Sequence, residues 1–282
     1  MKNKIKKIIS FCLSFMVLFE WFLLKAVRKE FTFKRRLSIQ TKRVKIFGNG
    51  PSLKNEALNI IDDCDYCCVN HSLMSDFFFK IKPKYFITVD PLYVADYLNK
   101  HEECVSRLLD VNWKMIWFVS YESFSLAKSL VKSNNNIQVK WHPSGLKLEM
   151  RIYWLRNRIF KYGLAAPPAQ NVLVAAIYDL LMDGYKKIEL YGVEHSWLSL
   201  LSVDKDNRVC LKDVHYYDDK EVHLKPWYRI DGEVFDMPSI LRTLAITFEA
   251  YHDLQRFSTY LGDVEIVNMT PNSFIDAFKR GV

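Results

Sequence analysis

The sequence predicts an α/β fold, a single Rossmann-like domain built on a mainly parallel sheet. Three observations favour it. From Lys42 onward, short β-branched runs alternate with helical segments, and half of the 282 residues are hydrophobic, with 15% aromatic. Polar residues also gather where the predicted strands end. Strands that alternate with helices are typical of a parallel sheet with helices on both faces. We therefore expect one domain over 42–282, preceded by a separate arm over 1–41.

The elements follow from apolar runs and their periodicity. The predicted strands are 44–49, 66–72, 84–91, 114–120, 137–142, 186–193 and 264–271. The predicted helices are 53–62, 171–184 and 239–262. The last two helices end at Gly184 and Gly262, residues typical of helix termini. The least regular segments are 140–170 and 196–238, and long loops of this kind often bind ligands.

The arm combines an apolar run with basic flanks. Residues 8–24 read IISFCLSFMVLFEWFLL, interrupted by two serines and Glu20, and no small-residue cleavage site follows. Residues 1–46 carry a net charge of +11 within the total of +8, which leaves −3 for the remainder. We expect the arm to associate with a membrane, either in the interface or as a single span, with the body on the cytoplasmic face. The alternative is an amphipathic helix packed on the body or on a partner.

The charge and the cysteines narrow the class of protein. The mildly acidic body disfavours a nucleic-acid partner. Cys64 and Cys67 have the spacing of a zinc pair, but no second pair follows, and Cys67 and Cys68 lie in a predicted buried strand. We interpret these as buried thiols rather than metal ligands or redox groups.

Small and polar residues follow the ends of the predicted strands. In an open parallel sheet, ligands bind beyond the carboxyl ends of the strands. The first strand ends in Gly48-Asn49-Gly50-Pro51-Ser52, the second in Asn70, the third in Asp90, and the strand 186–193 in Gly192 and Glu194. The glycines allow close backbone approach. We expect Ser52 to cap the helix that begins near Leu53, and the amides there to meet a phosphate.

In this order, the motifs resemble those of the bacterial family-42 sialyltransferases and their wider relatives. That family opens with a strand leading into Gly-Asn-Gly-Pro-Ser-Leu, here 48–53, and ends its second strand in Asn, here Asn70. A Gly-Tyr-Lys-x-Ile strand follows at 184–188, then a His-Tyr segment within VHYYDD, and finally Pro-Asn-Ser within TPNSF. Asp90 stands where the family has Asn. The similarity spans most of 43–275.

The resemblance implies a variant of the GT-A-like fold that uses a CMP-activated sugar acid without a metal or other cofactor. Asn49, Ser52 and Asn70 take the family's nucleotide-contacting positions, and Gln170 and Asn171 its donor-contacting segment. With the strand-end residues, the expected donor-binding set is Gly48, Asn49, Gly50, Ser52, Asn70, Asp90, Gln170, Asn171, Gly192 and Glu194.

A histidine base is expected to deprotonate the acceptor hydroxyl, because the reference pKa of histidine lies near 6.5. His215 is the first choice, His223 is the second and His195 the third. Tyr216 or Tyr217 is expected to bind the departing phosphate, although packing is an equal alternative. No Asp-x-Asp pair ends a strand, and the pair at 204–206 lies in a predicted turn, so no metal is expected.

The sequence therefore predicts a membrane-associated glycosyltransferase on the cytoplasmic face of a bacterial inner membrane. It would transfer a nonulosonic acid (sialic, legionaminic or pseudaminic type) from its CMP donor to a glycan or lipid-linked glycan acceptor in surface polysaccharide biosynthesis. Three alternatives stay open: a CMP-Kdo transferase, a pterin-pyrophosphokinase-like enzyme, and a non-catalytic nucleotide-binding protein.

Overall fold

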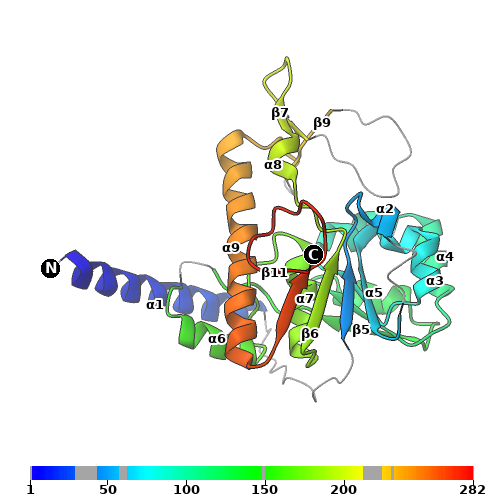
Figure 1. The fold of residues 1–282 in the computed structure, drawn as a ribbon, viewed down its shortest axis with the longest axis horizontal. Helices are drawn as coiled ribbons and strands as arrows, with labels where there is room; N and C mark the ends of the chain where they lie inside the picture. The colour runs from blue at the N-terminus through cyan, green and yellow to red at the C-terminus, as the bar shows by residue number, and fades with distance from the viewer. Residues whose placement is uncertain are drawn as a thin grey trace.

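An eight-stranded parallel sheet organises the molecule (Figure 1). The computed structural model describes residues 2–28, 43–56, 62–98, 100–147, 150–211, 224–229 and 232–281. The strand order is β11-β10-β6-β1-β2-β3-β4-β5, and every pair is parallel. The predicted α/β class and mainly parallel sheet are confirmed.

The seven predicted strands all form, each close to its expected place. The sheet consists of β1 (Val44–Phe47), β2 (Asp65–Val69), β3 (Tyr85–Thr88), β4 (Met115–Val119), β5 (Ile137–Trp141), β6 (Lys187–Tyr191), β10 (Glu265–Asn268) and β11 (Lys279–Arg280). Except for β11, these are the strands that the apolar runs predict.

Helices join the strands. In chain order they are α1 (Lys2–Arg28), α2 (Leu53–Glu56), η1 (Asn70–Met74), α3 (Asp76–Ile81), η2 (Tyr93–Leu98), α4 (Glu102–Leu109), α5 (Phe124–Leu130), α6 (Tyr153–Lys161), α7 (Val172–Met182), α8 (Trp197–Leu200) and α9 (Met237–Leu261). Asn171 caps α7 by accepting a hydrogen bond from Leu173 N, and Asp236 caps α9 in the same way from Ser239 N.

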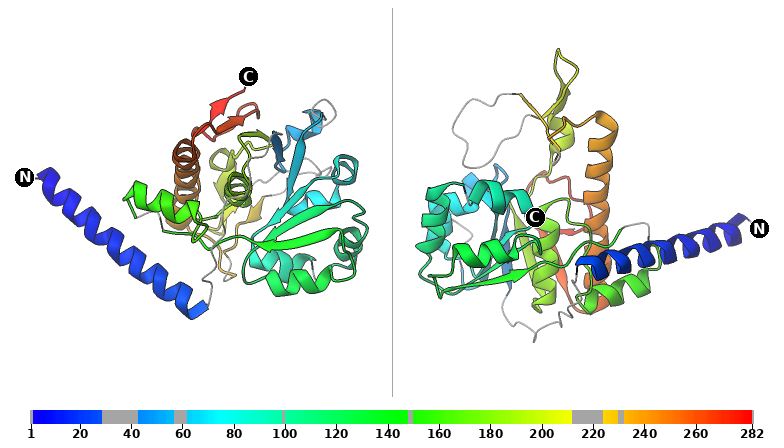
Figure 2. Two further views of the ribbon diagram at one scale, coloured as in Figure 1. Left: turned by 90° about the horizontal axis from the view of Figure 1, so that it is seen from below. Right: turned by 180° about the vertical axis from the view of Figure 1, so that it is seen from behind.

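Alternate residues of each strand face two separate apolar layers. In β1, Ile46 belongs to the apolar layer that contains residues of α6, α7 and α9, while Phe47 belongs to the layer that contains residues of α3, α4 and α5. In β3, Ile87 and Phe86 divide in the same way. This period of two, with both faces buried, is what a parallel sheet between two helical layers requires. Figure 2 shows the helices on either side of the sheet.

The two segments expected to be irregular contain regular elements. Helix α6 lies within 140–170 and buries Ile159 and Phe160, and the Phe160 ring meets Tyr178 of α7 and Phe257 of α9 edge-on. In 196–238, β7 (Leu201–Val203), β8 (Val209–Leu211) and β9 (Lys225–Pro226) form a small antiparallel sheet beyond the main one (Figure 1). These strands are too short for their periodicity to stand out.

Helix α1 runs past the body and touches it along one side (Figure 2). Ser14 and Val17 are buried, and Glu20 forms an ion pair with Lys147 at 2.6 Å. The other side exposes large apolar side chains. These are Phe11, Leu13, Phe15, Met16, Phe19, Phe22 and Leu23. Within the described part of the chain, no helix has both the length and the hydropathy needed to cross a bilayer.

Candidate ligand site at the carboxyl edge of the sheet

The strand order reverses direction at β1, and a cavity lies at this point. The chain runs outward from β1 through β2 to β5 on one side, and then returns to β6 on the other. Such a reversal leaves a crevice beyond the strand ends, the usual ligand site of open α/β sheets. The cavity here measures about 270 Å³. It is lined by Gly48, Asn49, Gly50, Pro51, Val69, Asn70, Asn171, Val172, Leu173, Gly192, Val193, Glu194, His195, Ser196, Trp197 and Leu200.

The glycines of the first turn are required by close packing against the β6 end. A Cβ on Gly48 would lie 2.2 Å from the carbonyl oxygen of Gly192. A Cβ on Gly50 would lie 1.5 Å from Oε2 of Glu194. Both distances are far inside van der Waals contact, so the turn and the Gly192–Glu194 segment approach this closely only because these positions lack side chains.

Two backbone amides of this turn already donate hydrogen bonds to acceptors within the protein. Gly50 N donates to Gly192 O at 2.9 Å, and Ser52 N donates to Oε1 of Glu194 at 2.7 Å. The Ser52 hydroxyl has no hydrogen-bond partner among the described residues, so its predicted role as a helix cap is wrong. The position at Ser52 N that a phosphate was expected to take is held by the Glu194 carboxylate.

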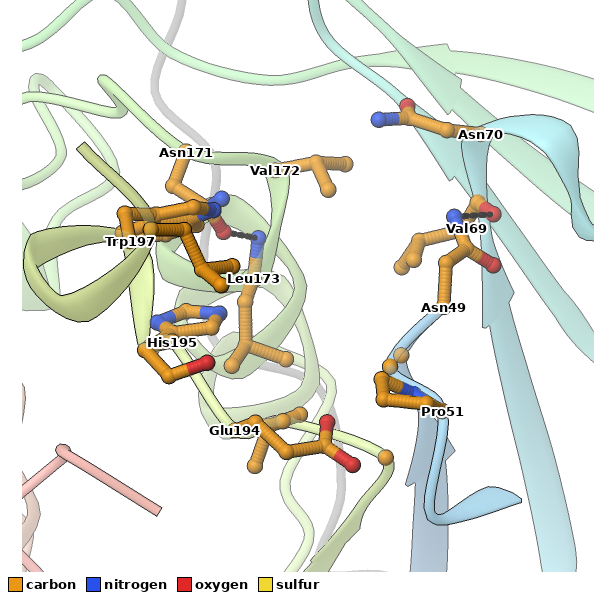
Figure 3. Close-up of a pocket in the computed structure, with 16 residues that line it drawn as sticks. Asn49, Pro51, Val69, Asn70, Asn171, Val172, Leu173, Glu194, His195 and Trp197 are labelled. Carbon is orange, nitrogen blue, oxygen red and sulfur yellow. Dashed lines mark hydrogen bonds between the residues drawn. The ribbon is translucent and has the colours of Figure 1, made fainter. Parts of the chain in front are cut away.

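Side-chain amides face the cavity from β1 and β2. Asn49 donates through Nδ2 to Val69 O at 3.4 Å, and its Oδ1 is buried without a partner in the described structure. Asn70 Oδ1 and Glu194 Oε2 are likewise buried without a hydrogen-bond partner in the described structure. Figure 3 shows the Asn70 side chain extending toward the opposite wall. Buried acceptors without partners are rare in folded proteins, and three around one cavity indicate a place for a hydrogen-bond donor.

The opposite wall is formed by the start of α7 and the segment after β6. His195 stacks on Trp197 with ring centroids 4.2 Å apart, and its Nδ1 lies 3.1 Å from the Tyr251 hydroxyl (Figure 3). Burial lowers the pKa of His195 to about 3 from its ordinary 6.5, so this imidazole is neutral at physiological pH. Burial also raises the pKa of Tyr251 well above its usual value. This wall therefore contributes polarity without charge.

The structure brings most of the expected donor-binding residues together. Gly48, Asn49, Gly50, Asn70, Asn171, Gly192 and Glu194 all line the cavity. Ser52, Asp90 and Gln170 do not line it. Asp90 instead accepts a hydrogen bond from Leu92 N at 2.9 Å, and Gln170 is exposed.

The expected catalytic loop cannot be placed. His215, Tyr216, Tyr217 and His223 lie outside the described residues. His195, the third candidate base, lines the cavity, but its lowered pKa makes it a weak proton acceptor.

Tyr251, which supports His195, was missed because it lies in the middle of α9 with no local signal. Its place in the i, i+3, i+4 periodicity marks it only as a core residue.

Cysteines and metal-ligating groups add nothing to this site. All six cysteines are free thiols, and burial raises the pKa of Cys67 and Cys68. In the described ranges, no three side chains of His, Cys, Asp or Glu are grouped so as to hold a metal ion. Compared with protein-family models, with curated proteins and with solved structures, the chain gives no match.

Proposed function

We propose that this protein is a glycosyltransferase that binds a CMP-activated nonulosonic acid at the β1–β6 cavity and transfers the sugar acid to a glycan hydroxyl. The observation that carries the proposal is the cavity itself. It lies where the strand order reverses, and it is walled by the Gly-Asn-Gly turn and Asn70 that the family resemblance assigns to the nucleotide.

The chemistry of the lining suggests which part of the donor lies deepest. Glu194 Oε2 and the Oδ1 atoms of Asn49 and Asn70 are hydrogen-bond acceptors. Ribose hydroxyls and the exocyclic amine of cytosine supply donors, whereas a phosphate does not. The nucleoside therefore fits beside Glu194, and the phosphate and sugar extend along the strand ends away from that carboxylate.

Nucleotide selectivity tests the proposal. Thermal unfolding is measured with CMP, UDP, GDP and ATP, each with and without magnesium. Stabilisation by CMP without magnesium is expected, because the unpartnered acceptors of Asn49, Asn70 and Glu194 can bind the ribose hydroxyls and the cytosine amine directly. A response to ATP with magnesium alone favours the pterin-pyrophosphokinase-like alternative, and no response to any nucleotide contradicts the proposal.

A matched pair of variants locates the binding site. Asn70 has a positive φ of 45°. The variant Asn70→Gly keeps this backbone conformation accessible and removes the amide, while Asn70→Asp keeps the shape and adds a negative charge. Both are expected to weaken CMP binding, Asp more than Gly. Asn135 is exposed and lines neither this cavity nor the one described below, so Asn135→Asp serves as a control for added charge on the surface.

We place the protein at the inner membrane surface through α1. The buried side of this helix packs on the body through Val17 and Trp21, which leaves Phe15, Met16 and Phe19 exposed. An exposed apolar helix face beside basic residues favours binding to anionic lipid. In this position the body stays next to lipid-linked acceptors.

Liposome sedimentation tests the membrane contact. The wild-type chain is expected to sediment with vesicles that contain phosphatidylglycerol and to stay in solution with neutral phosphatidylcholine. Phe15→Asp/Phe19→Asp should abolish sedimentation, whereas Tyr153→Asp, which changes an exposed aromatic residue of α6, should not. If the double variant and the wild type bind the vesicles equally, α1 does not form the membrane contact.

A further inference from the structure

A second cavity lies on the same edge of the sheet, beyond the ends of β3, β4 and β5. It measures about 210 Å³. Its lining residues are Val89, Pro91, Ser120, Tyr121, Glu122, His142, Pro143, Ser144, Gly145 and Ala169. Among the described residues, neither His195 nor any residue expected to bind the donor lines this cavity.

His142 and Asp179 form a buried pair at this cavity. His142 directly follows β5 and is 6% exposed, and Asp179, on α7, is fully buried at 0%. The His142 Nδ1 lies 2.9 Å from Oδ2 of Asp179. An ionised carboxylate only accepts hydrogen bonds, so the proton of a neutral imidazole lies on Nδ1 and Nε2 carries the lone pair.

The Nε2 atom of His142 forms no hydrogen bond with the described residues. It is also buried. Ser120 and Ser144 line the same cavity, yet neither hydroxyl bonds to it. A histidine that only held α7 to the sheet would need just its Nδ1. His142 is one of the residues that line the cavity, and a ligand hydroxyl that enters there would supply the partner that this nitrogen lacks.

The wall that carries His142 is held in place by a neighbouring segment. Leu146 N donates to Ala166 O at 2.8 Å, and Ala166 N donates to Ser144 O at 3.1 Å. Gly145 packs so closely that a Cβ there would lie 2.8 Å from Cα of Pro168. The imidazole also meets the Tyr178 ring edge-on, with centroids 5.6 Å apart. These contacts fix the position of the imidazole, as catalysis requires.

The two cavities are close enough to serve one reaction. Ala169 lines the second, and Asn171, two residues later, lines the first. Strands in a sheet are about 4.8 Å apart, so the ends of β1 and β5, four steps apart in strand order, are separated by roughly 19 Å. A donor held at β1 with its sugar directed toward β3 covers part of this span, and an acceptor sugar in the second cavity covers the rest.

From this arrangement we infer that the second cavity binds the hydroxyl-bearing acceptor sugar and that His142 is the catalytic base. The inference rests on the proposed function. The acceptor oxygen forms a bond to the anomeric carbon, its proton passes to Nε2 of His142, and the bond from that carbon to the phosphate oxygen breaks. The electron pair of that bond leaves with CMP. Asp179 is a positioning residue, which holds the tautomer and stabilises the imidazolium that forms.

Kinetics of His142 variants test the inference in the full-length chain. CMP release is followed with CMP-N-acetylneuraminic acid and a panel of methyl glycosides as acceptor probes. For His142→Gln, turnover is expected to fall at least 100-fold, with CMP affinity within twofold of the wild type. In His142→Ala, added imidazole should restore part of the turnover, which a merely structural role would not allow. The matched control is His252→Gln, an exposed position on α9 paired with Asp276.

Two results overturn the inference. One is turnover of His142→Gln above half the wild-type rate. The other is a loss of acceptor-dependent turnover in His215→Ala or His223→Ala while His142→Gln keeps the turnover of the wild type.

If the wild type neither binds CMP nor releases it, the proposed function fails, and the second cavity is then tested by NMR of ¹⁵N-labelled histidine. A shift of the His142 Nε2 signal on adding a methyl glycoside supports the acceptor site, and no shift overturns it.

Discussion

Among the described residues, one histidine lines each of the two cavities at the carboxyl edge, and the two histidines have different partners. His195 faces a neutral phenol, that of Tyr251, and stacks on an indole. Burial without a charged partner lowers its pKa to about 3. His142 is also buried, but it faces the carboxylate of Asp179 at 2.9 Å. The histidine of the second cavity therefore has a carboxylate as its partner, and the histidine of the first has a phenol.

This difference shows that the partner of a buried histidine, rather than its burial, decides what it can do. A neutral imidazole beside two asparagines and a glutamate suits recognition of a nucleoside. An imidazole with a carboxylate on Nδ1 and a lone pair on Nε2 suits proton transfer. The four predictions that follow test this division, from the largest expected effect to the smallest.

Replacing Asp179 should separate binding from catalysis most clearly. In Asp179→Asn, the amide can donate to His142 Nδ1, which moves the imidazole proton to Nε2 and removes the lone pair. We expect turnover to fall about 100- to 10,000-fold with CMP affinity unchanged. Asp183→Asn is the matched control, because Asp183 is also buried after α7 and lines neither cavity. Equal losses in the two variants would argue for a general effect of buried charge.

Tyr178→Phe should lower the free energy of unfolding, because the Tyr178 hydroxyl holds the segment that borders both cavities. The Tyr178 hydroxyl is 2.9 Å from Phe160 O and 3.0 Å from Ala165 O, at the start of the segment that borders both cavities. Removing it leaves buried carbonyls without this donor, at a cost of about 1–3 kcal/mol in the free energy of unfolding. Urea denaturation measures the loss. Tyr260→Phe, which changes an exposed hydroxyl on α9, should cost nearly nothing.

Gly50→Ala should damage the first cavity and spare the second. The new Cβ would overlap Oε2 of Glu194 and displace its carboxylate from Ser52 N. We expect CMP to bind about tenfold more weakly, equivalent to about 1.4 kcal/mol. In a double-mutant cycle with Glu194→Ala, the two losses should be less than additive, because they remove the same contact. Strict additivity, measured by calorimetry, would contradict the proposed overlap.

The acid sensitivity of folding should reveal the neutral state of His195. Its pKa in the folded state, about 3, lies below the ordinary 6.5, so the unfolded chain binds the proton more readily. The stability that this neutral histidine contributes is therefore complete above pH 6.5 and is lost as the pH falls toward 3. His195→Asn should flatten the fall in Tm over this range by a few degrees, while His252→Asn should not. Parallel curves for His195→Asn and the wild type would exclude the assigned neutral state.

The sequence predicts the fold well because every sheet strand except β11 is a short, largely apolar run beside a turn. VKIF, YFIT and KIELY are strands since both faces of the sheet are buried, and Gly262 ends α9 where expected. The carboxyl-edge residues of β1, β2 and β6 are equally predictable, because parallel strands place their ends together.

The rest of the site depends on contacts between distant segments. Nothing near Glu194 in the sequence indicates that its carboxylate bonds to Ser52 N, 142 residues away. His142 and Asp179 are separated by 37 residues, and Asp179 lies in a helix that otherwise reads as an apolar core element. An acidic residue within VLVAAIYDLLM was the available signal, because a buried carboxylate needs a partner.

The connection from α6 to α7 contributes residues to the walls of both cavities. The Tyr178 hydroxyl bonds to the beginning of this connection, at Ala165 O. Ala169 lines the second cavity, and Asn171 lines the first cavity and caps α7. A ligand that shifts this connection on one side alters the affinity on the other, and thermodynamic linkage makes the effect reciprocal. If the two cavities bind donor and acceptor as proposed, the apparent affinity for each substrate will depend on the concentration of the other.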